Sequence, residues 1–292
     1  MTLHDDEFLI DREIVADLIA DQRPEWSGLP LRRLETSGTV NVAYRLGNDK
    51  LIRLPRTEAF QDGPLHESRW LPRLAPDLPL EVPEHLWLGR PTERYPSPWS
   101  VLRWIEGGDA TPSALYDLDG AATRLAGFIL DLRSIDTTGA PDSSSRGRGL
   151  AASDAAFRRY VDRFPAQGAT SEIVGIWESC LAAPEWTGPP TWFHGDLHSG
   201  NLIARDGALV GVVDFEGCSV GDPASDLIAA WWLFDDDSRA AFRDVIDPDE
   251  AQWVRGKGWA LYMAVAAIPY YGDSNPDFAA MAHRALAEIL SD

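Results

Sequence analysis

The chain has 292 residues, of which 45% are apolar and 25% are charged, and its formal net charge is −20. This composition excludes a largely disordered chain, and the length predicts two lobes because it exceeds what one hydrophobic core usually supports. The charge disfavours nucleic acid and anionic membranes as partners, whereas it would attract a cationic small molecule.

The N-terminal region has no basic segment followed by an apolar stretch, and no run approaches the roughly 18 uninterrupted apolar residues of a membrane span. We therefore expect a cytoplasmic protein without a membrane partner, present as a monomer or weak dimer. Its two cysteines, Cys180 and Cys218, are too far apart in sequence to suggest a disulfide framework or a zinc site. We expect both to be buried free thiols.

The first 106 residues predict a small α+β lobe. Apolar side chains at helical spacing predict a first helix over residues 11–20. A second helix is expected around Glu67, and the Gly47-Asn48-Asp49 turn predicts a hairpin. Extended segments bounded by turn residues predict strands over residues 29–35, 42–47, 50–55 and 99–105.

The pattern from residue 107 onward is mainly helical. We expect a linker at about 102–107, a nucleotide-binding lobe over 1–106, and a catalytic and substrate-binding lobe over 107–292. Residues 137–149 have loop composition, either mobile or ordered over the active site, and two short strands are expected over 201–204 and 209–213. Helices are predicted over residues 118–133, 153–164, 172–182, 225–234, 250–268 and 277–290.

Three oxygen-bearing side chains, Asp196, Asn201 and Asp214, lie in a loop-and-strand segment within this helical part. A carboxylate such as Asp196 can accept a hydrogen bond from an attacking hydroxyl and then take its proton. Asn201 and Asp214 offer the neutral and anionic oxygen ligands that suit Mg²⁺ on substrate phosphates. Residue type, order and spacing together predict phosphoryl transfer.

Other polar residues near this motif are interpreted as structural support. His194 and His198 have the spacing of a zinc-binding helix, but Gly195 argues against a helix and the expected glutamate is missing, so both are expected to brace the loop. Asp222 and Asp226 are typical of a helix start, with Pro223 in the first turn.

The small lobe supplies candidates for nucleotide binding. Residues Ser37, Gly38 and Thr39 form a turn whose backbone N–H groups could contact phosphates. Arg53, on a strand, and Glu67, on the following helix, are candidates for a phosphate-binding cation and its ion-pair partner.

Together these residues resemble the aminoglycoside phosphotransferase family, a kinase-like group that also contains macrolide phosphotransferases. The similarity runs from Ser37-Gly38-Thr39 through Trp99-Ser100-Val101-Leu102-Arg103-Trp104-Ile105 to His194-Gly195-Asp196-Leu197-His198, Asp214-Phe215-Glu216 and Gly221-Asp222-Pro223. It implies a bilobal protein-kinase-like α+β fold, with an antiparallel sheet in the small lobe and a larger, mainly helical second lobe.

The resemblance also implies a role for each matching residue. Asp196 would be the catalytic base, Asn201 and Asp214 would hold magnesium, and the backbone of Arg103 and Ile105 would meet the purine of ATP or GTP. Arg53 departs from the lysine usual at its position, and a guanidinium is not equivalent to an ammonium.

We therefore predict a magnesium-dependent kinase that phosphorylates a hydroxyl of a small molecule, with an aminoglycoside-type antibiotic as the first candidate because the second lobe is acidic. It holds 28 acidic side chains against 13 basic ones, including Asp235-Asp236-Asp237. The alternatives are a macrolide phosphotransferase, a metabolic kinase for an amino alcohol or sugar, and a nucleotide-binding regulator without catalysis. Trp231, Trp232, Tyr270 and Tyr271 could line a macrolide pocket or belong to the core.

Overall fold

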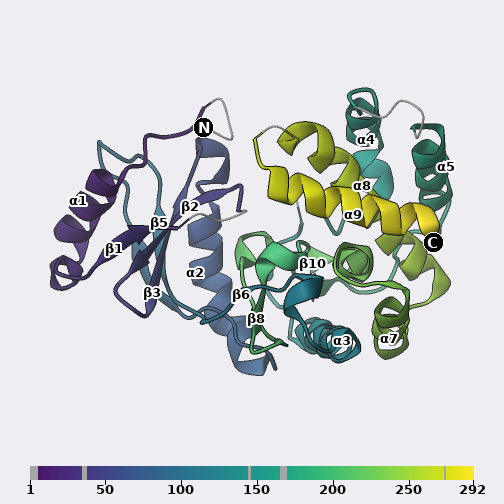
Figure 1. Ribbon diagram of the computed structural model, residues 1–292, viewed down its shortest axis with the longest axis horizontal. Helices are drawn as coiled ribbons and strands as arrows, with labels where there is room; N and C mark the ends of the chain where they lie inside the picture. Colours follow the sequence, from purple (N-terminus) through teal and green to yellow (C-terminus); the bar gives the residue numbers. More distant parts are fainter. Residues whose placement is uncertain (1–5, 35–37, 144–145, 165–169, 273) are drawn as a thin grey trace. The chain divides into compact units, whose positions relative to one another are not determined.

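The computed structural model describes residues 6–34, 38–143, 146–164, 170–272 and 274–292, and the chain forms two compact units (Figure 1). Unit 1 comprises Met1–Pro76, Glu81–Glu106 and Val212–Gly217, and unit 2 comprises Asp77–Leu80, Gly107–Gly211 and Cys218–Asp292. The sequence-based boundary at 106/107 coincides with one of these transitions. The segments 77–80 and 212–217 belong to the opposite unit from the one expected.

Unit 1 is built on a five-stranded antiparallel sheet with the strand order β1-β2-β3-β5-β4. The strand predicted over 50–55 is confirmed, while β4 was not anticipated. The strands are β1 (Leu31–Arg33), β2 (Asn41–Leu46), β3 (Lys50–Pro55), β4 (His85–Gly89) and β5 (Trp99–Arg103), and the helices are α1 (Arg12–Gln22) and α2 (Gly63–Leu74).

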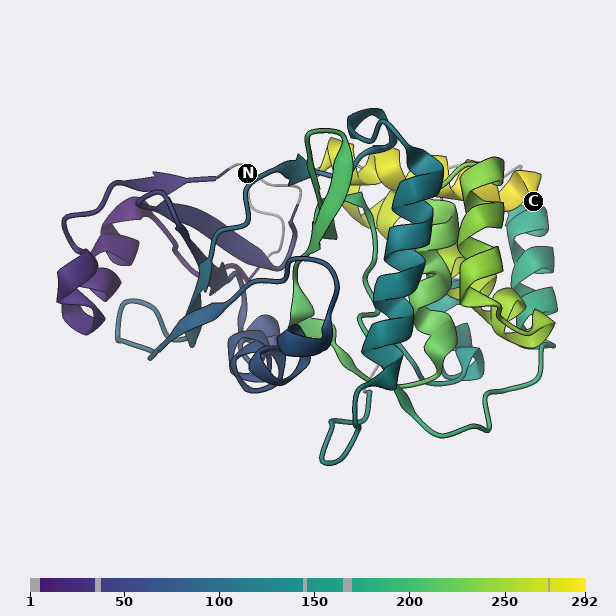
Figure 2. The ribbon, with the colours of Figure 1, turned by 90° about the horizontal axis from the view of Figure 1, so that it is seen from below.

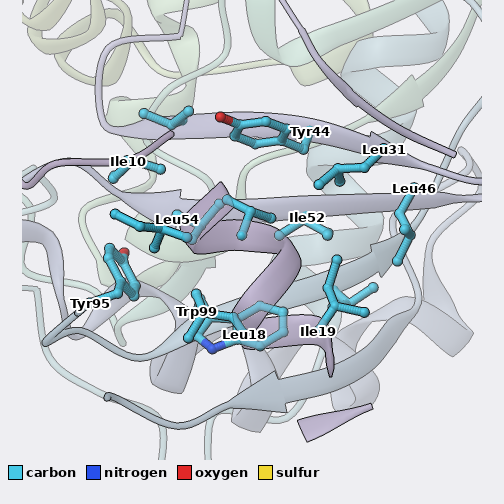
Figure 3. Close-up of a cluster of buried hydrophobic side chains, with 14 residues drawn as sticks. Ile10, Leu18, Ile19, Leu31, Tyr44, Leu46, Ile52, Leu54, Tyr95 and Trp99 are labelled. Atoms are coloured by element: carbon cyan, nitrogen blue, oxygen red, sulfur yellow. The ribbon is translucent and has the colours of Figure 1, made fainter. Parts of the chain in front are cut away.

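Alternation along β3 separates the core of unit 1 from its polar side. Ile52 and Leu54 are fully buried in the apolar cluster of Figure 3, with Leu18 and Ile19 of α1 packed against them. Successive side chains of a strand point to opposite faces, so Arg53 points away from this cluster. Its side chain bonds to Glu67 on α2. Strand pleating therefore places one buried cation opposite the hydrophobic core.

Unit 2 is mainly helical. Helix α8 is buried around most of its circumference and packs against α5 and α9, while α3, the long teal helix in Figure 2, packs against α7. The helices are α3 (Leu118–Ser134), α4 (Asp154–Val161), α5 (Thr170–Leu181), α6 (Ala229–Trp232), α7 (Asp236–Ile246), α8 (Glu250–Tyr271) and α9 (Pro276–Ser291). Over the described residues, no helix combines the length and apolar character needed to cross a membrane.

One sequence-based expectation for unit 2 was wrong, and one helix was not anticipated. The helix predicted over 225–234 is a 3-10 helix, η9 (Pro223–Ile228), followed by the single turn of α6. Helix α7 was not predicted, because its first turn is acidic and it buries few apolar side chains. A capping box formed by Asp235 and Ser238 starts α7 and was the available signal.

Short strands hold the polar motif of unit 2. The motif follows β7 (Thr191–Phe193), which pairs with β10 (Ser219–Gly221), and it precedes β8 (Leu202–Arg205), which pairs with β6 (Gly108–Asp109). Strand β9 (Ala208–Val212) lies next to β8 and completes a three-stranded sheet of order β6-β8-β9. The motif is therefore a loop anchored at each end by a strand.

Part of the loop 137–149 also lies on this scaffold. Val220 of β10 donates its N–H to the Pro141 carbonyl at 3.1 Å, and Asp222 donates its N–H to the Gly147 carbonyl at 2.9 Å. Asp142 forms a parallel bridge with Val220. The sequence left open whether this loop is mobile or ordered. Its described residues are ordered, because backbone hydrogen bonds tie them to β10 and to Asp222.

Candidate active site

The candidate residues form two groups, one in each unit. The first, called here the Arg53 cluster, consists of Arg53, Glu67, Asp214, Glu216 and Asn41 in unit 1. The second, called the Asp196 loop, consists of residues 194–201 in unit 2.

Arg53 is bound by three carboxylates. Its Nη1 donates to Glu67 Oε1 at 3.1 Å and its Nη2 donates to Asp214 Oδ1 at 2.5 Å. Glu216 Oε1 lies 3.1 Å from Nη2, and both oxygens of Glu216 accept from Asn41 Nδ2. Glu67 also accepts the backbone N–H of Phe215, which ties α2 to the segment that carries Asp214. One guanidinium thus organises three segments of unit 1.

The Arg53 cluster has more negative than positive charge, and the pKa values respond to this excess. Burial disfavours the guanidinium charge, but the three carboxylates outweigh burial and raise the pKa of Arg53. Burial raises the pKa of Glu216 to about 8, against the opposing effect of Arg53. Burial likewise raises the pKa of Glu67. A further cation would therefore be favoured at this cluster.

Asp214 has a backbone conformation that is uncommon for a residue other than glycine. Its φ is +70°, in the left-handed region that non-glycine residues rarely adopt. The Asp214 side chain is 27% exposed, and among the described residues only Oδ1 has a protein partner, Arg53. One carboxylate oxygen therefore remains available, and an anionic oxygen ligand of this kind fits magnesium.

The Asp196 loop owes its path to Gly195 and Asp226. Gly195 has φ +80°, and a Cβ there would lie 2.9 Å from the Phe193 ring, so glycine is required. Asp226 has no exposed surface, and its two oxygens accept the backbone N–H groups of His194 and Gly195 at 3.0 and 2.7 Å. Burial raises the pKa of Asp226, although these N–H groups oppose the rise.

Asp196 projects from this loop with a side chain that is 32% exposed. Its Oδ1 accepts from Arg146 Nη1 at 2.5 Å, and its Oδ2 accepts from Asn201 Nδ2 at 3.0 Å. His198 Nε2 lies 3.5 Å from Oδ2. Burial favours the neutral carboxyl, but Arg146 and His198 outweigh it and hold the pKa of Asp196 well below its usual range. Asp196 is therefore an ionised acceptor that solvent can reach.

Asn201 is oriented by the same carboxylate. Its amide nitrogen donates to both the backbone oxygen and Oδ2 of Asp196, each at 3.0 Å. This orientation leaves the amide oxygen without a protein partner among the described residues, so it is available as a neutral ligand. Asn201 therefore offers a neutral oxygen donor of the kind that suits magnesium.

The remaining residues of this loop are engaged locally. His194 Nδ1 accepts the Asp196 N–H at 3.3 Å, and His198 Nδ1 accepts the Gly200 N–H at 3.1 Å. Within the described part of the chain, no group of three or more His, Cys, Asp or Glu side chains is arranged to hold a metal ion. Asp222 caps η9 and forms an ion pair with Arg255 at 2.7 Å.

The other residues that were predicted to contact the nucleotide lie in unit 1. Ser37 lies outside the described residues, Gly38 is exposed and Thr39 is half-buried. Arg103 donates its backbone N–H to the Glu84 carbonyl at 2.8 Å, so that N–H is not available to a purine. Among the described residues, no backbone partner is found for the Ile105 N–H.

Three residues of the site were not anticipated from the sequence. Arg146 lies 50 positions before Asp196, and Asn41 lies 175 positions before Glu216. Glu216 stands two residues after Asp214, in a quoted motif, but nothing in the local pattern assigns it to Arg53. The alternation of arginine and glycine in Arg146-Gly147-Arg148-Gly149 was the available hint of a functional loop.

An aromatic group extends from the Asp196 loop to the surface of unit 2. The His198 ring packs edge-on against Phe278 at 5.2 Å, and Phe278 packs against Tyr271 at the same distance. Tyr271 contacts Tyr270, which is 52% exposed. Trp231 and Trp232 are fully buried and belong to the core.

Solved structures resemble the whole chain at low sequence identity. The GDP and kanamycin complex of APH(2″)-IIIa matches with a TM-score of 0.77 and 17% identity over 96% of this chain and 99% of that one. The streptomycin–ATP ternary complex of APH(2″)-IIa gives 0.63 and 18%, covering 97% of each chain. Macrolide 2′-phosphotransferase MphH from Brachybacterium faecium gives 0.61 and 20%, covering 95% and 98%. These matches confirm the kinase-like α+β fold.

A family model places the chain more specifically. The model described as the phosphotransferase enzyme family matches residues 31–259, a span that contains the Arg53 cluster and the Asp196 loop. No curated protein sequence gave a match. Since the family model covers most of the chain, this protein belongs to the phosphotransferase enzyme family, whose structurally similar members include aminoglycoside and macrolide phosphotransferases.

Proposed function

We propose that the chain transfers the γ-phosphoryl group of ATP or GTP to a hydroxyl group of a small molecule. The observation that carries this proposal is the state of Asp196. It is ionised, partly exposed and fixed by Asn201, as a residue must be to orient a hydroxyl and accept its proton. The similar structures with bound GDP and ATP support a nucleotide as donor.

Each group of residues has a part in the proposed reaction. Asp196 accepts a hydrogen bond from the acceptor hydroxyl and takes its proton as the new oxygen–phosphorus bond forms. Arg53, fixed by Glu67, contributes positive charge toward the nucleotide phosphates. The available oxygens of Asn201 and Asp214 would hold magnesium, which would neutralise charge on those phosphates when bound. The Ile105 N–H remains the candidate donor to the purine.

For the acceptor, we propose an aminoglycoside-type molecule. The net charge of −20 favours a polycation, and the similar structures include complexes with kanamycin and streptomycin. The Asp235–237 run contributes less than its sequence suggests, because Asp235 caps α7 and Asp236 binds Arg239. The attraction of a polycation therefore depends on the net charge of the whole chain and not on this acidic run.

One observation favours a macrolide as the second candidate. The aromatic group of Phe278, Tyr271 and Tyr270 presents apolar surface that begins at His198, beside the proposed base. Apolar side chains with a few polar groups are typical of sites for large organic ligands.

A turnover screen tests the proposed function. Release of nucleoside diphosphate is measured with ATP and with GTP against aminoglycosides, macrolides, amino alcohols and sugars, in the presence of magnesium. We expect acceptor-dependent turnover that Asp196→Asn lowers by about 10²- to 10⁴-fold. An Asp237→Asn variant, which changes an exposed carboxyl in α7, is the matched control and should turn over normally. Absence of turnover with every acceptor would refute the proposal.

A further inference from the structure

Arg146 is held beside the proposed base by hydrogen bonds of its backbone and its side chain. The residue after it, Gly147, has φ +85°, and a Cβ there would lie 2.3 Å from the Phe193 ring of β7. The Gly147 carbonyl accepts the Asp222 N–H, and the Ser143 hydroxyl donates to the Arg146 carbonyl. The carbonyl groups of Arg146 and Gly147 are therefore both bound to their surroundings, so the position of this side chain is not that of an unrestrained surface arginine.

The guanidinium uses only part of its hydrogen-bonding capacity. Its Nη1 donates to the Gly195 carbonyl and to Asp196 Oδ1. Among the described residues, Nη2 and Nε have no protein partner, and the side chain is 33% exposed. An arginine has five N–H donors in a planar fork that matches phosphate oxygens. Arg146 thus presents unused donors to solvent immediately beside the base.

The two oxygens of Asp196 have different surroundings. Oδ2 is engaged by Asn201 and approached by His198, whereas Oδ1 has Arg146 as its one hydrogen-bond partner among the residues that the structure describes. Because a carboxylate oxygen accepts about two hydrogen bonds, Oδ1 can accept the acceptor hydroxyl as well. The acceptor oxygen and the Arg146 guanidinium would then share Oδ1, at a separation of about 5 Å or less.

We propose that Arg146 is a further catalytic residue, which binds the oxygens of the phosphoryl group during its transfer to the acceptor bound at Asp196. This inference rests on the proposed function. In the step, the acceptor oxygen bonds to the γ-phosphorus, the bond from that phosphorus to the β,γ-bridging oxygen breaks, and nucleoside diphosphate leaves. The hydroxyl proton passes to Asp196. Arg146 keeps its protons and stabilises the negative charge on the transferred group.

The alternative is an ion pair that only orients Asp196. That role would be preserved by a lysine, which retains the charge but lacks the planar fork. It also predicts no specific contact with the transferred group. The affinity for a transition-state analogue therefore distinguishes the two roles, because only a residue that contacts the transferred group contributes directly to binding the analogue.

The test compares Arg146→Ala, Arg146→Lys and Arg148→Ala in the full chain. Arg148 is an exposed arginine two residues away in the same loop, so it controls for loss of charge. We expect Arg146→Ala to lower kcat by about 10³-fold, and Arg146→Lys to recover only a small part of this loss. The acceptor KM should change by less than about threefold, and added guanidinium ion should restore activity to Arg146→Ala but not to Asp196→Asn.

A binding measurement supplies the second readout. Tetrafluoroaluminate with nucleoside diphosphate, magnesium and acceptor mimics the transferred phosphoryl group. Arg146→Ala should weaken binding of this complex while leaving nucleoside diphosphate affinity unchanged. Thermal unfolding of each variant identifies any loss caused by misfolding.

The outcomes separate the two proposals. If the wild-type chain turns over but Arg146→Ala retains kcat, or Arg146→Lys is fully active, Arg146 only positions Asp196 and the inference is overturned. The same holds if the analogue binds equally well to wild type and Arg146→Ala. If the wild-type chain phosphorylates no acceptor, the proposed function itself fails and this inference fails with it.

Discussion

Arg53 shows why an arginine, and not a lysine, suits its position. Its two terminal nitrogens divide their contacts, with Glu67 on Nη1 and Asp214 and Glu216 on Nη2. A lysine would offer one compact ammonium on a flexible stem in place of two terminal nitrogens held in a planar fork. The departure from lysine is therefore matched by the carboxylates around it, and is more than a consequence of a chain with few lysines.

This matching predicts the effect of Arg53→Lys on stability. The charge remains, but at least one charged hydrogen bond is lost in a buried cluster, so the free energy of unfolding should fall by about 1.5–3 kcal/mol. Urea denaturation measures the loss, and Arg90→Lys, at an exposed side chain, serves as the control. Equal stability of the two variants would contradict the assigned role of the fork.

Asp226 has a similarly defined role. Its carboxylate is the partner of two backbone N–H groups that start the Asp196 loop. In Asp226→Asn the amide nitrogen replaces one acceptor, which leaves a buried donor unpaired and should lower the free energy of unfolding by about 1–3 kcal/mol. Asp237→Asn should cost almost nothing. Urea denaturation of the two variants makes the comparison, and a loss of kcat beyond the loss of folded protein would show that loop geometry also matters.

The buried thiols predict a dependence of stability on pH. Burial raises the pKa of Cys180 to about 11, above the value of about 8.5 for an unfolded cysteine. A group whose pKa is raised on folding contributes stability that is complete below the unfolded pKa and is lost as pH rises through the folded pKa. Stability should therefore decline between about pH 8.5 and 11, and Cys180→Ala should reduce that slope in denaturation at several pH values.

At the scale of elements, the helices differ in how closely their glycines are packed. Gly127 in α3 has open space where a Cβ would be, whereas a Cβ at Gly256 in α8 would lie 2.5 Å from Leu227. Glycine inside a helix costs about 0.5–1 kcal/mol relative to alanine when nothing opposes the new methyl group.

The two positions predict opposite signs for one substitution. Gly127→Ala should raise the free energy of unfolding by about 0.5–1 kcal/mol, and Gly256→Ala should lower it because the buried contact must shift. Thermal and urea denaturation of both variants provide the measurement. A destabilised Gly127→Ala would show that α3 is more constrained than its packing indicates.

Element prediction from sequence succeeded where one pattern dominates. The extended segment 50–55 with its flanking turn residues, and the apolar spacing of 118–133, predicted β3 and α3 within a residue or two. The acidic first turn of α7 concealed its helical pattern, and the buried residues of η9 form a 3-10 helix where helical spacing alone favours an α-helix. The residues of the phosphotransferase motif were also accessible from sequence, because they lie within a short segment.

Contacts between distant segments were not accessible. Nothing near Arg146 indicates that it binds Asp196, and nothing near Asn41 indicates that it binds Glu216, because the tertiary fold alone brings these partners together. The sequence therefore indicated which residues could carry the proposed chemistry but not the residues that surround their charged groups.

For the whole molecule, the net charge of −20 predicts how the proposed aminoglycoside-type acceptor would be attracted. Long-range attraction of a polycation is screened by salt, so kcat/KM for an aminoglycoside should fall by about tenfold or more between low and high ionic strength. Steady-state kinetics at several salt concentrations give this dependence. The nucleotide is the internal control, because kcat/KM for an anion should not fall as salt is added. If kcat/KM for the aminoglycoside does not depend on salt, electrostatic steering is ruled out.

Residues Val212–Gly217 belong to unit 1 although they follow Gly107–Gly211 of unit 2 in the sequence, and this order affects folding during biosynthesis. When the first 106 residues leave the ribosome, Arg53 has Glu67 beside it but lacks Asp214 and Glu216, which are made more than 100 residues later. Domains usually fold as units during synthesis, starting from the N-terminus. Here the N-terminal sheet can form early, but its charged cluster can be completed only after most of unit 2 has been translated. A nascent chain stopped before residue 212 would therefore hold a sheet whose buried cation still lacks two of its three carboxylate partners.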